Sequence, residues 1–471
     1  MQTAAVRGGE EKLAETYRTF ILRHFSLNAE SRKPYVYYNT WNYQERVRHW
    51  QDKPYLSSMN LQRMLLEIEQ AHKMGIDVFV IDTGWYSKTG DWQVNRERFP
   101  DGLRQVKAKL DEYGMKLGLW FGPTSAAMSS NMLGQNLTNQ SSMDGKNRDP
   151  HSVWETEESA ELCLVSGYAD DFADELIRLS QELGVTYFKW DAICQYGCND
   201  PHHHHGDEGA LAQEREECYS FLQPLYMVRI IEKLTEACPE AIVDFDVTEG
   251  YRCVGLSFLS AGKYFLLNNG PYYANFNIPK DKDITWKNNN MFFYPGAARG
   301  WVCRTPLAYD KWIPTVLFLT HYLPDDPVDF QDMAVGSLIL GQNGIWGDLL
   351  GVSFEGTDRI GKLIGLYKQI RDDITENALR RTGIPGGNPE VYEKISSRSG
   401  KGTVVLFANA FGVPFHSPRP ASFTYITHCK PDRKVWYTEG VTVRYDTEGY
   451  AVITADFEKP GAKIVYFGVK D

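Results

Sequence analysis

Eight strand-like segments, most of them separated by helix-like segments, follow one another along this 471-residue chain, and this alternation restricts the fold more than any other feature. The strand-like segments are rich in β-branched and aromatic residues, and the helix-like ones repeat apolar residues every three or four positions. We expect strands at 35–41, 76–85, 116–123, 185–193, 241–247, 263–270, 291–296 and 335–349. We expect helices at 9–25, 57–75, 102–115, 168–184, 219–238, 310–323 and 354–375.

An alternation of this kind predicts parallel strands joined by right-handed crossovers. Eight such units favour an α/β chain folded as a (β/α)8 TIM barrel. An open, doubly wound sheet is the alternative, but no G-x-G-x-x-G follows the first strand, so a dinucleotide site is not supported. We assign residues 1–30 to a helix that leads into the barrel and residues 31–384 to the barrel itself.

The last part of the chain has a different pattern. From about residue 385, short runs of alternating polar and apolar residues are separated by Gly, Pro and Asp. This pattern predicts a C-terminal antiparallel β-sandwich over residues 385–471.

Charge and composition exclude several classes of partner. The net charge is −11, whereas nucleic acids and anionic membranes call for basic patches. No apolar run is long enough to span a bilayer. The N-terminal residues lack the apolar core of a secretory signal, and the eight cysteines show no paired framework, so we expect a cytoplasmic protein with reduced thiols. We expect no metal and no organic cofactor, and the sequence does not indicate an oligomeric state.

Polar and aromatic residues gather where the predicted strands end. In a TIM barrel these ends form the face that carries the chemistry. The residues at these ends are Trp41, Asp82, Trp85, Trp120, Lys189, Asp191, Asp246, Glu249, Arg252 and Trp346. Carboxylates and cations suit the hydroxyl groups of a sugar, and tryptophan covers its apolar face. The alternative for any single acid is that it caps a helix or pairs with a basic residue.

Several motifs resemble those of glycoside hydrolase family 36, the α-galactosidase or melibiase group, which shares a clan with family 27. The matching motifs, in the order and spacing of that family, are NTW (39–41), FVIDTGW (79–85), GDWQVNRERFPDGL (90–103), GMKLGLWF (114–121), YFKWD (187–191), FYPGA (293–297) and LGQNGIWGDL (340–349). The chain is therefore similar to a divergent member of this family.

The resemblance implies a retaining exo-α-glycosidase that acts on a terminal α-linked, galactose-like sugar of an oligosaccharide or glycoside. Asp191 corresponds to the nucleophile, which forms a covalent glycosyl-enzyme. Lys189 and Asp82 would bind the sugar, and a cation beside Asp191 favours its charged form. By the same resemblance, the pocket is lined by tryptophans, which are Trp41, Trp85 and Trp120.

Three departures from the family pattern affect this expectation. The family has two adjacent aspartates after the second strand, where this chain has Asp82 and Thr83. Its fifth strand leads into a Gly-rich segment with an arginine, where this chain has DFDVTEGYR (244–252), so that Arg252 matches the arginine. Asn268 occupies the position of the family's acid/base aspartate, and an amide cannot exchange the proton that this role requires.

Three explanations remain open for the missing acid/base. Asp246 or Glu249 on the neighbouring strand has taken over the role, or the alignment of the sixth strand is shifted. Alternatively, the protein is a sugar-binding or catalytically weak member of the same family. An enzyme restricted to substrates with good leaving groups, which need no acid, is a further hypothesis.

The segment CQYGCNDPHHHHGDE (194–208) is the most metal-like stretch of the sequence. Zinc ligands must converge on one point, and consecutive residues of an extended chain point in opposite directions. We therefore favour a solvated loop after the fourth strand. A role at the rim of the active site and a metal site are the alternatives.

Overall fold

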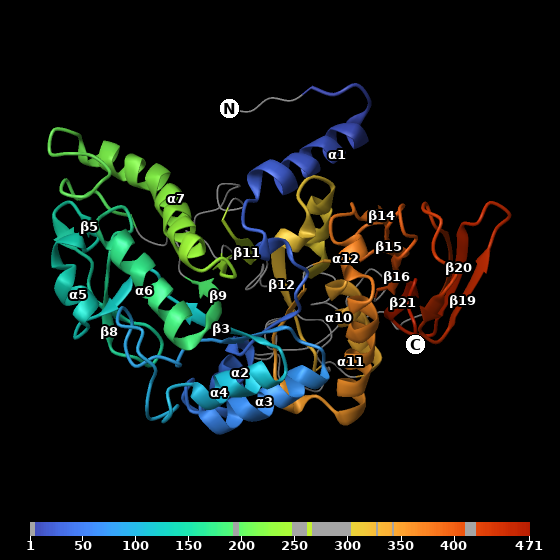
Figure 1. Cartoon of the computed structure of the whole chain (residues 1–471), viewed down its shortest axis with the longest axis horizontal. Coiled ribbons are helices and arrows are strands. Elements are labelled where there is room, and N and C mark those ends of the chain that lie inside the picture. Colours follow the sequence, from blue (N-terminus) through green and yellow to red (C-terminus); the bar gives the residue numbers. More distant parts are fainter. Residues whose placement is uncertain are drawn as a thin grey trace.

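Eight parallel strands close into a barrel in the computed structural model, which describes residues 5–191, 197–246, 261–265, 303–325, 328–341, 343–409 and 421–471 (Figure 1). The barrel strands are β1 (Tyr37–Asn39), β2 (Val78–Ile81), β3 (Lys116–Phe121), β9 (Val185–Trp190), β10 (Ile242–Asp246), β11 (Lys263–Phe265), β12 (Phe318–Tyr322) and β13 (Asn343–Ile345). Each strand pairs with its neighbours in chain order, and β1 closes the ring by pairing with β13. The predicted (β/α)8 barrel is confirmed, and the open sheet is excluded.

The helices of the described residues cover the outside of this barrel and extend from it. They are α1 (Glu10–Phe20), α2 (Trp41–Gln51), α3 (Leu61–Lys73), α4 (Arg104–Glu112), α5 (Asn131–Gln135), α6 (Tyr168–Leu183), α7 (Ala212–Ala237), α10 (Val328–Leu338), α11 (Phe354–Lys368) and α12 (Arg371–Ile374). Helix α2 was not expected, because we assigned no element between the strand at 35–41 and the helix at 57–75. Strand β1 ends at Asn39, and the next segment is helical with a buried stretch at 42–47.

The seventh strand lies elsewhere than the sequence indicated. Strand β12 falls inside 310–323, which we expected to be helical, and the preceding turns are the 3-10 segments η5 (Thr305–Lys311) and η6 (Thr315–Leu317). A short apolar run cannot be assigned to helix or strand by periodicity alone. Pro314 and Pro324 enclose this run and limit it to the length of a strand. The predicted strand at 291–296 lies outside the described residues.

The eighth strand is also shorter than expected. Residues 335–338 of the predicted strand form the last turn of α10, and only β13 pairs in the barrel. The apolar run in this region is therefore divided between the buried helix α10 and strand β13.

Two antiparallel sheets follow the barrel, and in Figure 1 they lie at the opposite end of the molecule from α5 and α7. The first contains β14 (Arg380–Thr382), β15 (Glu390–Ile395), β16 (Gly402–Ala408), β18 (Val435–Tyr437) and β21 (Gly461–Phe467). The second contains β17 (Ala421–Ile426), β19 (Val441–Tyr445) and β20 (Ala451–Phe457). The predicted antiparallel β-region is confirmed, and β14 begins ahead of residue 385, where we expected the domain to start.

The five-stranded sheet carries apolar side chains on both of its faces. On β16, Val405 and Phe407 belong to the barrel core, whereas Val404 and Leu406 belong to a separate core shared with the smaller sheet. This division follows from the two-residue period of a strand. Gly336 of α10 lies so close to β16 that an added Cβ would be 2.9 Å from the side chain of Val405. The sheet is therefore fixed tightly to the barrel.

A long excursion separates β3 from α6. It contains a small sheet of β4 (Ser125–Ala127), β7 (His151–Ser152) and β8 (Glu158–Glu161), and a hairpin of β5 (Ser142–Met143) and β6 (Lys146–Asn147). In the part of the chain that the structure describes, no helix combines the length and the apolar character needed to cross a membrane.

Candidate active site at the barrel mouth

The alternation of side chains along β9 determines which residues face the barrel interior. Tyr187 packs inside the barrel, whereas Phe188 and Trp190 belong to the core between the barrel and its helices. The backbone N–H of Asp191 donates to Phe121 O at 2.9 Å, which continues the pairing with β3 beyond the end of β9. Tyr187, Lys189 and Asp191 therefore follow one another along the inward face.

Asp82 follows β2 and is the direct partner of Lys189. Lys189 Nζ donates to Asp82 Oδ2 at 3.1 Å, and Asn39 Nδ2 donates to the same oxygen at 3.0 Å. The other carboxylate oxygen accepts from the backbone N–H and the hydroxyl of Thr83, both at 2.8 Å. Both charged side chains are buried. Thr83, which replaces the second aspartate of the family pattern, thus orients Asp82.

Lys189 carries a charge although it is buried. Burial alone lowers the pKa of a lysine, but the nearby carboxylates of Asp82, Asp191 and Asp246 outweigh this effect, and the pKa of Lys189 is raised above its ordinary value. The barrel mouth therefore holds a permanent cation among three acids.

Trp120, the fifth residue of β3, contacts Asp191 directly. Its indole N–H donates to Asp191 Oδ2 at 3.1 Å. The carbonyl of Trp120 accepts from Trp85 Nε1 at 2.9 Å, and its ring stacks on that of Tyr86. These contacts fix the indole that holds the Asp191 carboxylate.

The other tryptophans expected at the strand ends occupy different depths. Trp85 is fully buried in an aromatic cluster with Trp92 and Phe121, so it supports Trp120 from behind. Trp346 is buried in the interior core of the barrel. Trp41 is half-buried at the start of α2 and packs against that interior core.

Strand β10 adds acids to the same interior. Asp244 lies opposite Lys189 in the strand register and accepts from the Tyr187 hydroxyl at 2.6 Å. Asp246 is on the same face, two residues nearer the mouth, and is 1% exposed. We did not predict the pair of Tyr187 and Asp244, although the alternation along β9 already placed Tyr187 on the face of Lys189.

Three of the predicted site residues lie outside the described residues: Glu249, Arg252 and Asn268. The acid/base assignment and the position of the arginine therefore remain predictions. The described residues bring together Asp82, Trp120, Lys189, Asp191 and Asp246.

The loop after β9 differs from the solvated loop that we favoured. Cys198, His203 and His205 are buried, whereas His202 and His204 are exposed. Consecutive histidines do point in opposite directions, as the sequence argument stated. The predicted solvated loop is wrong because alternate histidines share one face, and this face is buried.

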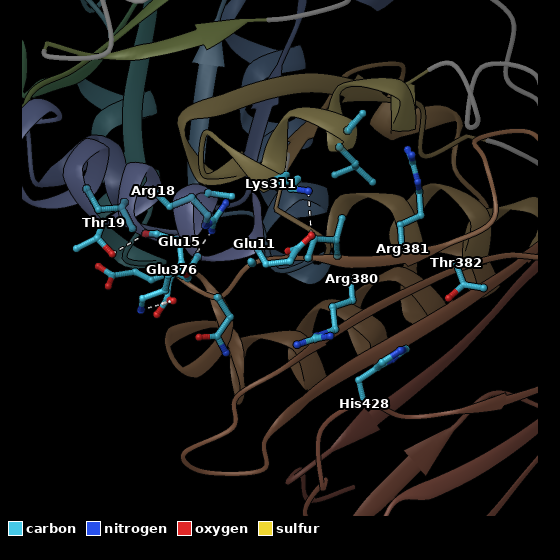
Figure 2. A pocket seen from close by; sticks show the side chains of 18 of the residues that line it. Glu11, Glu15, Arg18, Thr19, Lys311, Glu376, Arg380, Arg381, Thr382 and His428 are labelled. Atoms are coloured by element: carbon cyan, nitrogen blue, oxygen red, sulfur yellow. Dashed lines mark hydrogen bonds and ion pairs between the residues drawn. The ribbon is translucent and has the colours of Figure 1, made fainter. Parts of the chain in front are cut away.

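A charged groove also opens at the other end of the barrel (Figure 2). Most of its lining comes from α1, η5 and residues 376–382, and Lys311 forms ion pairs with Glu10 and Glu11. Because η5 and η6 precede β12, this groove is at the amino ends of the strands. It contains none of the residues predicted for the active site.

Comparison with known proteins agrees with the motifs and the barrel. Residues 9–254, more than half of the chain, match the family model described as Melibiase. The chain belongs to the melibiase family. This melibiase-family chain is 26% identical over 186 residues to α-galactosidase 1 of Pediococcus pentosaceus, which covers 38% of this chain and 24% of that protein. It is 24% identical over 398 residues to an α-galactosidase of Escherichia coli, which covers 82% of this chain and 49% of that protein.

Solved structures resemble the whole melibiase-family chain. A GH36 α-galactosidase of Geobacillus stearothermophilus in complex with raffinose matches with a TM-score of 0.65 at 16% identity, over 98% of this chain and 59% of that one. An α-galactosidase of Lactobacillus brevis matches with a TM-score of 0.67 at 17% identity, with the same coverage. These likenesses support the fold. The chain spans about half or less of the length of the two curated relatives above.

Proposed function

We propose that this chain is a retaining exo-α-glycosidase that hydrolyses terminal α-linked galactose-like sugars through a covalent glycosyl-aspartate. The observation that carries the proposal is the position of Asp191 at the end of β9, with its carboxylate held by Trp120 and close to the charged Lys189. Membership of the melibiase family supports the same reaction.

In the first step, Asp191 attacks the anomeric carbon. A carboxylate oxygen forms a bond to this carbon as the glycosidic bond breaks, and the leaving oxygen takes a proton from a second carboxylic acid. In the second step, that group removes a proton from water, which displaces Asp191 and restores the original configuration. Retaining enzymes hold the two carboxyl groups about 5–5.5 Å apart.

The remaining groups of the barrel mouth would hold the sugar. Asp82 is an acceptor that suits sugar hydroxyl groups, and Lys189 is a donor. Trp41 and Trp120 offer apolar ring surface for a sugar face. Because Asp82 is already bound by Asn39, Thr83 and Lys189, its orientation is set before substrate arrives, which lowers the entropic cost of binding.

The proton donor is assigned to Asp246 or Glu249. Asp246 favours this assignment because it is a carboxyl group on the inward face of β10, beside the strand that carries Asp191. Azide can replace a missing acid/base in the second step. Comparing azide rescue in Asp246→Ala and Glu249→Ala variants therefore identifies the residue.

The substrate class is a galactose-terminated oligosaccharide or glycoside. A related GH36 structure holds raffinose, which supports this class. A cytoplasmic location is part of the proposal, and it is supported by the free thiols of all six cysteines among the described residues.

A sugar-binding protein on the same barrel is the second candidate, and the single observation in its favour is Asn268 at the position of the family's acid/base. Leaving-group dependence separates the possibilities. An enzyme with a working acid hydrolyses dinitrophenyl and alkyl α-galactosides at comparable rates. An enzyme without one is active only on the dinitrophenyl substrate.

The experiment that tests the proposed function follows hydrolysis of an aryl α-galactoside by proton NMR. We expect α-galactose to form first and then to mutarotate. A first product in the β-configuration would contradict the retaining mechanism. Galactose binding by calorimetry without turnover of any substrate would establish the sugar-binding protein instead.

A further inference from the structure

Two cysteines and two histidines meet in a buried cluster between the loop that follows β9 and the excursion that follows β3. Cys163, Cys198, His203 and His205 each offer one ligand atom, and these atoms all lie within 4.8 Å of one another. All four residues are buried. Each of them is a residue type that binds zinc as thiolate or imidazole.

Two distant segments supply these residues. Cys163 follows β8 in the excursion before α6, and its backbone N–H donates to Asn139 O at 2.8 Å. The other three come from the loop after β9. The backbone N–H of His204 donates to Val165 O at 2.9 Å, and that of Asn199 donates to Ser142 O at 2.9 Å. The backbone itself therefore holds the two segments in register.

The distances fit a tetrahedral metal ion. Zinc binds sulfur at about 2.3 Å and nitrogen at about 2.0–2.1 Å, so the sulfur and nitrogen ligands of a tetrahedral site lie about 3.6 Å apart. Cys198 Sγ and His203 Nδ1 are 3.3 Å apart. This pair is therefore close to the spacing of a tetrahedral site, and the other ligand atoms, all within 4.8 Å of one another, would draw closer on binding the ion.

The surroundings of the ring nitrogens of His203 and His205 also point to a metal. His203 Nε2 is 2.9 Å from Thr138 O, an arrangement that makes Nε2 the donor and leaves the Nδ1 lone pair facing Cys198. Both ring nitrogens of His205 are buried and have no hydrogen-bond partner among the described residues. Buried polar groups are normally partnered, and a metal ion would supply a partner for one of these two nitrogens.

We propose that Cys163, Cys198, His203 and His205 bind one Zn²⁺ ion in a structural site. Four protein ligands complete the tetrahedron and leave no open position for water or substrate, which is typical of structural zinc. The site joins the loop that follows Asp191 to the excursion between β3 and α6. It therefore stabilises the fold next to the barrel mouth and takes no part in the chemistry.

The direct test is the zinc content of the purified protein, measured by inductively coupled plasma mass spectrometry. We expect one zinc per chain in the unmodified protein and a loss of nearly all of it in Cys198→Ser and His203→Ala variants. Matched controls are Cys218→Ser, a free cysteine outside the cluster, and His202→Ala, an exposed member of the same histidine run. Both controls should keep the metal.

A second measurement remains decisive if the ligand variants fail to fold. Treating the unmodified protein with a chelator should lower its melting temperature, and zinc but not magnesium should restore it. Cobalt added to the chelated protein should give the visible bands of a tetrahedral site and a thiolate charge-transfer band.

Three results would overturn the proposal. The first is a purified, zinc-supplemented protein without bound zinc. The second is equal zinc content in Cys198→Ser and Cys218→Ser. The third is a disulfide between Cys163 and Cys198, recognised because these thiols react with a thiol reagent only after reduction and not after chelation.

Discussion

The barrel mouth and the junction between the barrel and the C-terminal sheets each contain a fully buried ion pair. Lys189 pairs with Asp82 at the mouth, and Arg304 pairs with Glu390 at the junction. Both pairs are removed from water, where an unpaired charge is costly. They differ in how the surrounding groups balance the charge.

At the junction, one cation meets one anion, and the neighbouring groups complete the network. Arg304 binds Glu390 through two nitrogens, at 2.7 and 2.9 Å, and also donates to Ser337 and Asn409. Glu390 accepts further hydrogen bonds from the Tyr392 hydroxyl and from Asn409. The charges and hydrogen bonds of this network are balanced within the protein, so the network needs no ligand.

At the mouth, the described residues set one cation among three acids. Asp82, Asp191 and Asp246 all act on Lys189, and carboxylates are acceptors without donors. A sugar supplies hydroxyl donors that such a group of acceptors can bind. A charge-balanced buried network therefore stabilises the fold, whereas an excess of acids around one buried cation marks a site that binds a ligand at some cost in stability.

The largest expected effect comes from Asp191→Asn. We expect kcat to fall by at least ~10⁴-fold, because the change removes the proposed nucleophile. The melting temperature should stay the same or rise, since like charges at the mouth are reduced. Steady-state assays and thermal unfolding measure both values. A large loss of stability would show that Asp191 stabilises the fold, as Glu390 does at the junction.

Arg304→Met should lower stability and leave activity unchanged, the opposite of what we expect for Asp191→Asn. It leaves Glu390 buried without its cation, so we expect the free energy of unfolding to fall by about 3–5 kcal/mol. The activity per folded molecule should remain close to that of the unmodified protein. Denaturant unfolding checks the first value, and the double variant Arg304→Met/Glu390→Met should recover much of the loss. Unchanged stability in the single variant would contradict this role.

A smaller effect is expected from Trp120→Phe, which removes the N–H that donates to Asp191. A hydrogen bond to a charged group contributes about 1.5–3 kcal/mol, so kcat/KM should fall by about 10–100-fold. Trp190→Phe is the matched control, because Trp190 is on the outward face of β9. Equal losses in the two variants would mean that packing, and not the hydrogen bond, is responsible.

Lys394 of β15 provides the smallest effect and a dependence on pH. Burial lowers its pKa to about 8, although Asp310 opposes the shift. Because the unfolded pKa is higher, the charged lysine destabilises the fold below pH 8, and this cost disappears as the pH rises from 8 towards 10.5. Lys394→Met should therefore raise the free energy of unfolding at pH 7 by about 1–2 kcal/mol. It should also remove the rise in stability between pH 8 and pH 10.5, which denaturant unfolding at several pH values measures. A less stable variant at pH 7 would contradict the shift.

The sequence predicted the barrel well where its strands alternate clearly. Strand β9 carries β-branched and aromatic residues and ends in a polar pair, so both its extended backbone and its position at the mouth could be predicted. Strand β12 could not, because its short apolar run suits a buried helix equally well.

The mouth residues could be predicted because the carboxyl ends of parallel strands meet at one face. Their hydrogen-bond partners could not, since the contact of Trp120 with Asp191 depends on the exact register of β3 and β9. The Cys/His cluster was missed for a related reason. Cys163 is far from Cys198 in the sequence, and only the folded excursion brings them together.

Trapping of the covalent intermediate tests the central claim most directly. Incubation with 5-fluoro-α-galactosyl fluoride slows the second step more than the first, so the glycosyl-enzyme accumulates. Intact-mass analysis should show one fluorogalactosyl group per chain, and peptide mapping should locate it on Asp191. Hydrolysis of α-galactosides with the adduct on a different residue, or with no adduct, would contradict the account.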